Sequence, residues 1–115
     1  MELVALLSSG QGTLGQVSGL IKQGEWDNIF LVGTEVAEKF TVDKEHEFIK
    51  VSSSRLVELK EEIMSKLKGK IKGTEVALSI ASGDGKEHMA LISALLSIPV
   101  GIRFVALTKD GIVYM

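Results

Sequence analysis

The sequence predicts a single α/β domain over residues 1–115, with a mostly parallel sheet between two helix layers, and three observations support this. Short apolar runs alternate with amphipathic stretches along the whole chain, as they do in repeated strand–helix units. The first apolar run, Leu3–Leu7, is continuous, which is typical of a parallel strand that helices cover on both faces. The sequence Lys109-Asp110-Gly111 is a tight-turn signal between the last two apolar runs and predicts a C-terminal antiparallel hairpin.

Three strands and two helices are expected in the first half of the chain. A helix follows the first strand, because apolar residues repeat at helical spacing from Leu14 until Gly24 ends the pattern. Gly33 and Thr34 open a short second helix, from Glu35 to about Phe40. The third strand alternates in polarity, which predicts an edge strand. The expected strands are Leu3–Leu7, Asn28–Val32 and Glu47–Val51.

Two helices and three strands are expected in the second half. Ser52–Ser54 precede a helix from Arg55 to about Lys68 and are expected to cap it, since serine hydroxyls accept hydrogen bonds from the first helical N–H groups. A helix from Lys86 to Ile98 follows later, and Pro99 ends it. The expected strands are Glu75–Ile80, Ile102–Leu107 and Ile112–Met115.

The order of these elements predicts a Rossmann-like three-layer sandwich with a C-terminal antiparallel hairpin. Strand order in such folds usually begins 3-2-1-4, which places the first and fourth strands side by side. Each of these two strands is followed by a glycine-rich turn that opens a helix. The two turns should therefore face one crevice at the carboxyl edge of the sheet. Free N–H groups and the helix dipole favour an anion there, so the sequence predicts a phosphate-binding site.

The candidate ligand-binding residues lie in these two turns. Asp84 and Glu87 have the spacing of a capping box, whereas Lys86 places a cation at a helix N-terminus and opposes the helix dipole. A bound anion would remove that conflict. Ser8 and Ser9 end the first strand, where a hydroxyl can reach into the crevice, although serine is also common in turns. The predicted ligand-binding residues are Gly10, Gly12, Thr13, Ser82, Gly83, Asp84, Gly85 and Lys86.

Two other readings of the glycines are open. The series Gly10-x-Gly12-x-x-Gly15 matches the dinucleotide-binding fingerprint, with Glu35 placed 20 residues after Gly15. A dehydrogenase would also need a substrate domain, for which this chain leaves no residues. Alternatively, the glycines only allow tight strand-to-helix turns. His88, in the fourth helix, is expected to be a surface residue rather than a catalytic one.

Composition narrows the class of partner and the compartment. The formal net charge is −2, and Lys and Glu are interspersed, so no basic face for long nucleic acid is expected. Cysteine is absent, which excludes disulfides and zinc–thiolate sites, and neither a metal nor a cofactor is expected. No apolar stretch approaches the ~20 residues of a membrane span, and no secretory signal is recognisable, so we expect a cytoplasmic protein. The low Asn and Gln content resembles that of thermophile proteomes.

The helix expected over residues 86–98 is apolar on nearly every side. Only Ser93 and Ser97 interrupt its apolar residues between Met89 and Ile98. A helix that covers one sheet face needs a single apolar stripe, so its second face should be buried against something else. A homodimer through this helix is the simplest explanation.

The chain resembles CARF domains, the CRISPR-associated Rossmann-fold sensors of cyclic oligoadenylates. The resemblance covers nearly the whole chain and rests on the strand–turn–helix order, the small-residue turn after the first strand, and the apolar helix and hairpin at the end. A Thr-Gly-Gly-Thr-Lys-x-Met-like turn follows the fourth strand and reads Ser82–Met89 here. Two residues rather than one separate Lys86 from Met89, and Ser79 or Ile80 stands where the family often has Asp or Asn.

The resemblance implies a homodimer that binds a cyclic oligoadenylate across its two-fold axis during antiviral signalling, with or without slow cleavage. A metal-independent ring nuclease lets the ligand's 2′-hydroxyl attack the neighbouring phosphate. By this resemblance Lys86 would stabilise the developing charge, and Ser8 or Ser9 would position the scissile unit. The alternatives are a small mono- or dinucleotide-binding module and a non-catalytic interaction subunit.

Overall fold

Six strands and four helices alternate along the part of the chain that the structure describes. A computed structural model describes residues 1–8, 11–52 and 54–115, with the side chains of residues 11 and 12 left out. The strands are β1 (Glu2–Leu6), β2 (Ile29–Gly33), β3 (Glu47–Lys50), β4 (Glu75–Ser79), β5 (Gly101–Thr108) and β6 (Gly111–Tyr114). The helices are α1 (Gln11–Gln23), the short 3-10 helix η1 (Glu35–Lys39), α2 (Leu56–Leu67) and α3 (Gly85–Ser97).

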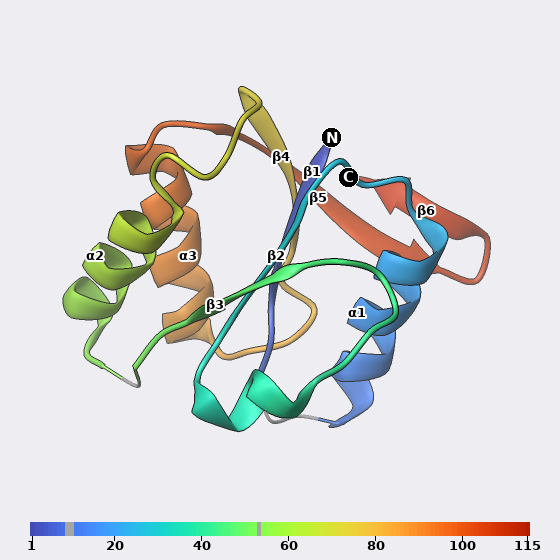
Figure 1. Cartoon of the computed structure of the whole chain (residues 1–115), viewed down its shortest axis with the longest axis horizontal. Helices are drawn as coiled ribbons and strands as arrows, with labels where there is room; N and C mark the ends of the chain where they lie inside the picture. Colours follow the sequence, from blue (N-terminus) through green and yellow to red (C-terminus); the bar gives the residue numbers. More distant parts are fainter. Residues whose placement is uncertain (9–10, 53) are drawn as a thin grey trace.

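The strands form one sheet in the order β3-β2-β1-β4-β5-β6 (Figure 1). All neighbouring pairs are parallel except β5 and β6, which form an antiparallel hairpin. Ala5 of β1 lies opposite Leu31 of β2 on one side and Ser79 of β4 on the other. The predicted fold class is therefore confirmed, as is the placement of the first and fourth strands side by side.

Two apolar cores lie on opposite faces of this sheet. Side chains alternate along β1, so that Val4 and Leu6 pack with α2 and α3, whereas Leu3 and Ala5 pack with α1. The two helix layers stand on either side of the strands in Figure 1. All four of these side chains are buried, which explains why the apolar run is continuous in the sequence.

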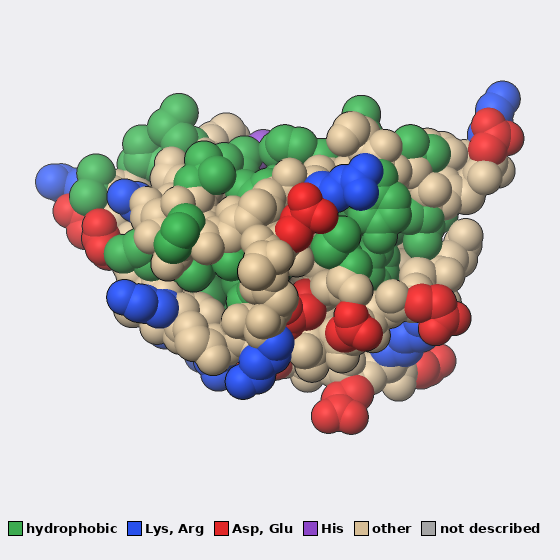
Figure 2. All heavy atoms as spheres, turned by 90° about the horizontal axis from the view of Figure 1, so that it is seen from above, with side chains coloured by type: hydrophobic (Ala, Val, Ile, Leu, Met, Phe, Trp, Pro, Cys, Tyr) green, Lys and Arg blue, Asp and Glu red, His purple; other side chains and the backbone are tan. Residues whose placement is uncertain are grey.

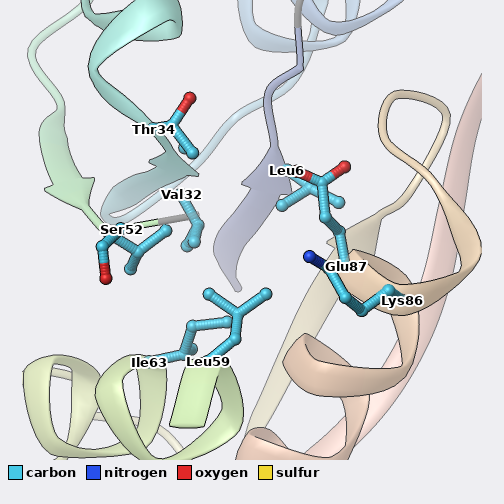
Figure 3. A pocket seen from close by; sticks show the side chains of 10 residues that line it. Leu6, Val32, Thr34, Ser52, Leu59, Ile63, Lys86 and Glu87 are labelled. Carbon is cyan, nitrogen blue, oxygen red and sulfur yellow. The ribbon is translucent and has the colours of Figure 1, made fainter. Parts of the chain in front are cut away.

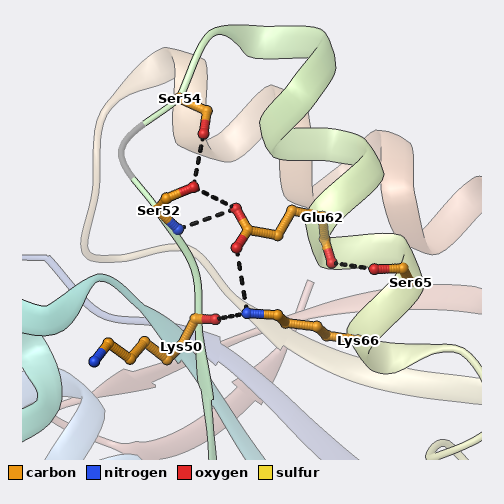
Figure 4. A network of polar contacts seen from close by, with 6 residues as sticks. All are labelled: Lys50, Ser52, Ser54, Glu62, Ser65 and Lys66. Atoms are coloured by element: carbon orange, nitrogen blue, oxygen red, sulfur yellow. Dashed lines mark hydrogen bonds and ion pairs between the residues drawn. The ribbon is translucent and has the colours of Figure 1, made fainter.

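The predicted cap of α2 is wrong. Arg55 occupies the N-cap position, and its side chain makes no capping hydrogen bond. Ser52 instead donates both its amide and its hydroxyl to the Glu62 carboxylate, at 3.0 and 2.7 Å, and its hydroxyl also lies 2.8 Å from Ser54 Oγ (Figure 4). Hydrogen bonds to a charged acceptor are stronger than neutral ones, and the Ser52 amide and hydroxyl donate to the Glu62 carboxylate in this way. Ser53 lies outside the described residues.

Helix α2 covers part of the second face of α3. The two helices pack side by side on the same face of the sheet (Figure 1). Four residues of α3 are completely buried between α2 and the sheet, namely Ala90, Leu91, Ala94 and Leu95. A partner chain is therefore not needed to cover this part of α3, and only Met89 and Leu96 remain as large exposed apolar side chains of the helix. None of the described helices is long and apolar enough to cross a membrane.

Candidate functional site

The residues that directly follow β1 and β4 lie against each other at the carboxyl edge of the sheet. The Ser8 amide, just after β1, donates a hydrogen bond of 2.8 Å to the Ser82 hydroxyl, just after β4. The predicted neighbourhood of the two turns is thus present. Ser82 is completely buried, however, and its hydroxyl joins the turns, so this predicted ligand-binding residue is not open to a ligand in this state.

The turn before α3 is held by its own backbone and side chains. Gly83 has a φ of +101°, and an added Cβ would lie 2.4 Å from a methyl carbon of Leu6, so only glycine fits there. Asp84 accepts a 2.8 Å hydrogen bond from the Glu87 amide, and Glu87 accepts a 2.9 Å bond from the Asp84 amide. This reciprocal pair is the predicted capping box. It fixes the helix start that carries Lys86.

Lys86 bridges the start of α3 and the segment that precedes α2. Its ammonium donates a hydrogen bond of 2.8 Å to the Ser54 carbonyl oxygen. An ammonium group has three N–H donors, and within the described residues Lys86 shows no second hydrogen bond. Donors therefore remain for an anion at this position.

The Lys86 nitrogen points into a small pocket with an apolar floor (Figure 3). The enclosed cavity has a volume of ≈ 20 Å³, which is room for about one water molecule. Its mouth carries Lys86, Glu87 and two hydroxyl residues, Thr34 and Ser52. Its floor consists of five buried side chains from the α2–α3 core, Leu6, Val32, Val51, Leu59 and Ile63. We call this space the Lys86 pocket.

An open groove adjoins the Lys86 pocket. It has a volume of ≈ 490 Å³ and shares Thr34, Val51 and Ser52 with the pocket. Lys50 and Lys66 lie at its far end. Pocket and groove together form a continuous hollow over the carboxyl ends of β1, β2 and β3, which we call the carboxyl-edge groove.

The carboxyl-edge groove is displaced from the predicted crevice between β1 and β4. The hydrogen bond between Ser8 and Ser82 and the contact of Gly83 with Leu6 occupy the space between the two turns. Among the predicted residues that the structure describes, Lys86 alone lines the groove. Thr34 lines both the pocket and the groove, whereas the sequence predicts only a helix start there. Its position directly after a buried strand is the signal that indicates a site residue.

The remaining predicted residues of the first turn are partly outside the description. Ser9 and Gly10 lie outside the described residues, and Gly12 and Thr13 belong to the first turn of α1. Ser8 is half-buried. Ser79, at the end of β4, is 1% exposed, and its hydroxyl finds no hydrogen-bond partner among the described residues. Such an orphan is costly in an interior and is uncommon in folded proteins.

The third glycine of the dinucleotide fingerprint does not play the part that the fingerprint gives it. That glycine normally allows close packing of helix and strand, yet Gly15 is exposed, and an added Cβ would meet nothing within 4 Å. Close packing occurs one turn later, where an added Cβ at Gly19 would lie 2.5 Å from Leu107. Glu35 is exposed in η1.

His88 supports the second turn from within. The residue is half-buried rather than on the surface, and its Nε2 donates a hydrogen bond of 2.8 Å to the Ser82 carbonyl oxygen. His46 is also half-buried, and its Nδ1 donates to the Lys44 carbonyl oxygen at 2.9 Å. Both rings therefore have structural partners in this state.

Glu62 and Lys66 control the charge at the far end of the carboxyl-edge groove. Burial by itself raises the pKa of Glu62, but the hydrogen bonds from the Ser52 hydroxyl and amide and the contact with Lys66 outweigh it and hold the pKa below that of an ordinary glutamate (Figure 4). Lys66 also donates to the Lys50 carbonyl oxygen. The carboxylate is therefore ionised at neutral pH and partly offsets the nearby lysines.

The surface seen from above mixes charges of both signs with exposed hydrophobic side chains, and no basic stripe crosses it (Figure 2).

The chain matches no known protein-family model and no curated protein. What the groove can do must therefore follow from its chemistry. A cation with spare donors, two hydroxyl residues and an apolar floor can hold an anionic group that is attached to an apolar or planar one.

Proposed function

We propose that this chain binds a small nucleotide in the carboxyl-edge groove, with a phosphate at Lys86. The observation that carries the proposal is the Lys86 ammonium, which points into the mouth of an apolar pocket and has donors to spare. A lysine at a helix N-terminus opposes the helix dipole, so a bound anion would relieve an unfavourable arrangement. Gly85 and Lys86 are the first two residues of α3, so no carbonyl within the helix accepts a hydrogen bond from their backbone N–H groups.

The dimensions favour the groove for the base and the pocket mouth for the phosphate. The enclosed cavity is too small for a base, whereas the ≈ 490 Å³ groove lies within the range of roughly 300–1,000 Å³ that small-molecule sites occupy. Thr34 and Ser52 stand where pocket and groove meet and can donate hydroxyl hydrogen bonds to a phosphate or sugar. A dinucleotide is disfavoured, because Gly15 lacks the packing role of the fingerprint.

Among small nucleotides, a cyclic oligoadenylate is the ligand that the CARF resemblance favours. Each chain offers one Lys86, and a ring of repeated units would engage two copies related by a two-fold axis. Met89 is exposed one turn after the start of α3, and Leu96 is exposed two turns further on. Contact between these residues of two copies would bring two Lys86 side chains to the same ligand.

Slow cleavage of the ring is the second part of the proposal. The 2′-oxygen of one unit would attack the adjacent phosphorus, and the bond from phosphorus to the 5′-oxygen would break. The products would be a 2′,3′-cyclic phosphate and a free 5′-hydroxyl, with the proton of the 2′-hydroxyl transferred through solvent. The chain would contribute charge stabilisation through Lys86. By the CARF resemblance Ser8 would align the scissile unit, which requires the ring to extend beyond the groove to the end of β1, because Ser8 does not line the groove.

Calorimetric titration with cyclic tetra-adenylate, cyclic hexa-adenylate, ATP and NAD tests the binding. Lys86→Ala should weaken the preferred ligand by about 1.5–3 kcal/mol, as expected for a charge-assisted hydrogen bond. Lys22→Ala is the matched control, because Lys22 is exposed in the last turn of α1, away from the groove. Equal affinities of the two variants would place the site elsewhere. A chain that binds none of the four compounds would be an interaction subunit instead.

A further inference from the structure

The two edges of the sheet differ in their protection against strand pairing. The β3 edge carries Glu47 and Lys50, and the Lys66 ammonium covers the Lys50 carbonyl oxygen. Lys70 forms an ion pair with Glu47 on the same edge. Charged side chains on an edge strand are the usual protection against pairing with another chain. The β3 edge is therefore closed to a further strand.

The β6 edge has no such protection. No charged residue occurs from Gly111 to Met115. The Met115 amide donates to the Phe104 carbonyl oxygen, and in an antiparallel ladder the residues that face the partner strand alternate with those that face away. The peptide groups of Ile112 and Tyr114 therefore point outward from β5. Within the described part of the chain, no other strand covers them.

The sheet face beside this edge is apolar and exposed. Ile102 packs into the α2–α3 core, so Phe104 and Ala106, at alternate positions of β5, lie on the same face of the sheet. Val113 lies opposite Ala106 and shares that face. Phe104 is 37% exposed and Val113 is 41% exposed. The apolar edge thus continues into an apolar surface.

The extent of this surface suits a contact between copies of the chain. Phe104 and Val113 lie on the α3 side of the sheet, as do the exposed Met89 and Leu96 of α3, whereas Tyr114 lies opposite Val105 on the α1 side. At about 200 Å² for a whole large side chain, the exposed parts of the four residues on the α3 side amount to roughly 350–400 Å². That lies within the roughly 300–600 Å² of the largest apolar patch on a monomer, which is often functional, and is about half of the ~800 Å² that each partner contributes to a standard interface.

We propose that β6 of one chain pairs antiparallel with β6 of a second copy, which joins their two sheets into one continuous sheet. Centred on Val113, this register sets Ile112 opposite Tyr114 of the other copy, and each such pair exchanges both of its backbone hydrogen bonds. The contact is self-complementary, as a two-fold axis requires. Arg103 lies over the Tyr114 ring at 5.0 Å.

This contact is separate from the proposed ligand site. Antiparallel pairing of β6 points the carboxyl edges of the two sheets in opposite directions, so the two Lys86 pockets would not share a ligand. The β6 contact is therefore a different dimer from the one that would share a ring through Met89 and Leu96, and it can be tested on the chain without a nucleotide.

A single-cysteine variant tests the register, because the chain has no cysteine of its own. In the proposed pairing, the two Val113 residues form a non-hydrogen-bonded pair with Cα atoms about 4.5 Å apart, within the range of roughly 4.4–6.8 Å that a disulfide spans. Under oxidised glutathione, Val113→Cys should form a linked dimer at least tenfold faster than Val57→Cys. Val57 is a suitable control, since it is 63% exposed on α2. Equal linkage of the two variants would overturn the proposal.

A charge at the same position gives a second test by sedimentation. Val113→Lys would set two ammonium groups against each other at the two-fold axis, so the mass of the particle should fall to half that of the wild type. Val57→Lys should leave the mass unchanged. Circular dichroism reports whether both variants are folded. A folded Val113→Lys variant with the wild-type mass would also overturn the proposal.

Discussion

The side-chain amide of Gln16 pairs with both backbone groups of Leu107. Gln16 Nε2 donates to the Leu107 carbonyl oxygen at 3.0 Å, and the Leu107 amide donates to Gln16 Oε1 at 2.7 Å. Strand β4 ends at Ser79, whereas β5 continues to Thr108. Gln16 thus supplies, from α1, the hydrogen bonds that a longer β4 would have made. This contact ties the first helix to the C-terminal hairpin.

Gln16→Glu should therefore destabilise the fold. The variant keeps the shape of the side chain but replaces the Nε2 donor with an oxygen, which leaves the Leu107 carbonyl without a partner. A loss of about 1–3 kcal/mol in the free energy of unfolding is expected from urea denaturation. Gln23→Glu, exposed at the end of the same helix, is the control. Equal stabilities of the two variants would show that the pairing contributes nothing.

Two glycines should respond in opposite ways to alanine. Gly15→Ala should raise the free energy of unfolding by about 0.5–1 kcal/mol, because the position is helical and open. Gly83→Ala should lower it by more than 1 kcal/mol, because of its positive φ and the contact with Leu6. Gly15→Ala should also leave nucleotide affinity unchanged. A loss of NAD binding in that variant would revive the dinucleotide interpretation.

The lowered pKa of Glu62 makes part of the stability depend on pH. A group whose folded pKa lies below its unfolded value stabilises the fold above the unfolded pKa, and this contribution is lost as pH falls through the folded pKa. The free energy of unfolding of the wild type should therefore exceed that of Glu62→Gln by about 1 kcal/mol at pH 7, and the difference should disappear as the pH falls through the lowered, folded-state pKa of Glu62. Thermal unfolding of both proteins across this range measures it. A difference that is independent of pH would contradict the assignment.

Leu96→Glu tests whether α3 takes part in a contact between copies. Leu96 is 59% exposed, so a glutamate there should leave the fold intact while it weakens any contact through α3. Leu91 and Leu95 are completely buried, and charges at these positions would unfold the chain instead of reporting on association. Sedimentation of the wild type and Leu96→Glu, with and without cyclic tetra-adenylate, gives the answer. An unchanged mass in both conditions would exclude this surface.

Ser8→Ala separates cleavage from binding. Alignment of the scissile unit acts in the transition state, so the variant should slow ring cleavage at least tenfold while affinity changes little. Chromatography of linear products that end in a 2′,3′-cyclic phosphate follows the reaction, and added EDTA should not change the rate. Wild type that binds the ring but yields no product would show that Ser8 has no chemical role. A rate abolished by EDTA would indicate a metal mechanism instead.

The amino-acid sequence by itself determined the order and type of the strands and helices. The continuous apolar run Leu3–Leu7 predicts that β1 is buried on both faces, and the capping box of α3 involves only Asp84 and Glu87, which are three residues apart. The order of β1 and β4 follows from the rules for right-handed crossovers. These features could be predicted because they depend on residues that are close in sequence or on general topology.

Only the tertiary structure decided where the groove lies and which polar groups are still available to a ligand. The Ser82 hydroxyl is taken by Ser8, 74 residues away, and the Lys86 ammonium reaches Ser54, 32 residues away. Burial of α3 depends in the same way on α2, and completion of the sheet depends on Gln16. In each case, several groups that are distant in sequence could form the same hydrogen bond or cover the same apolar surface. The local pattern of residues does not show which of them does so, because that depends on how the chain packs.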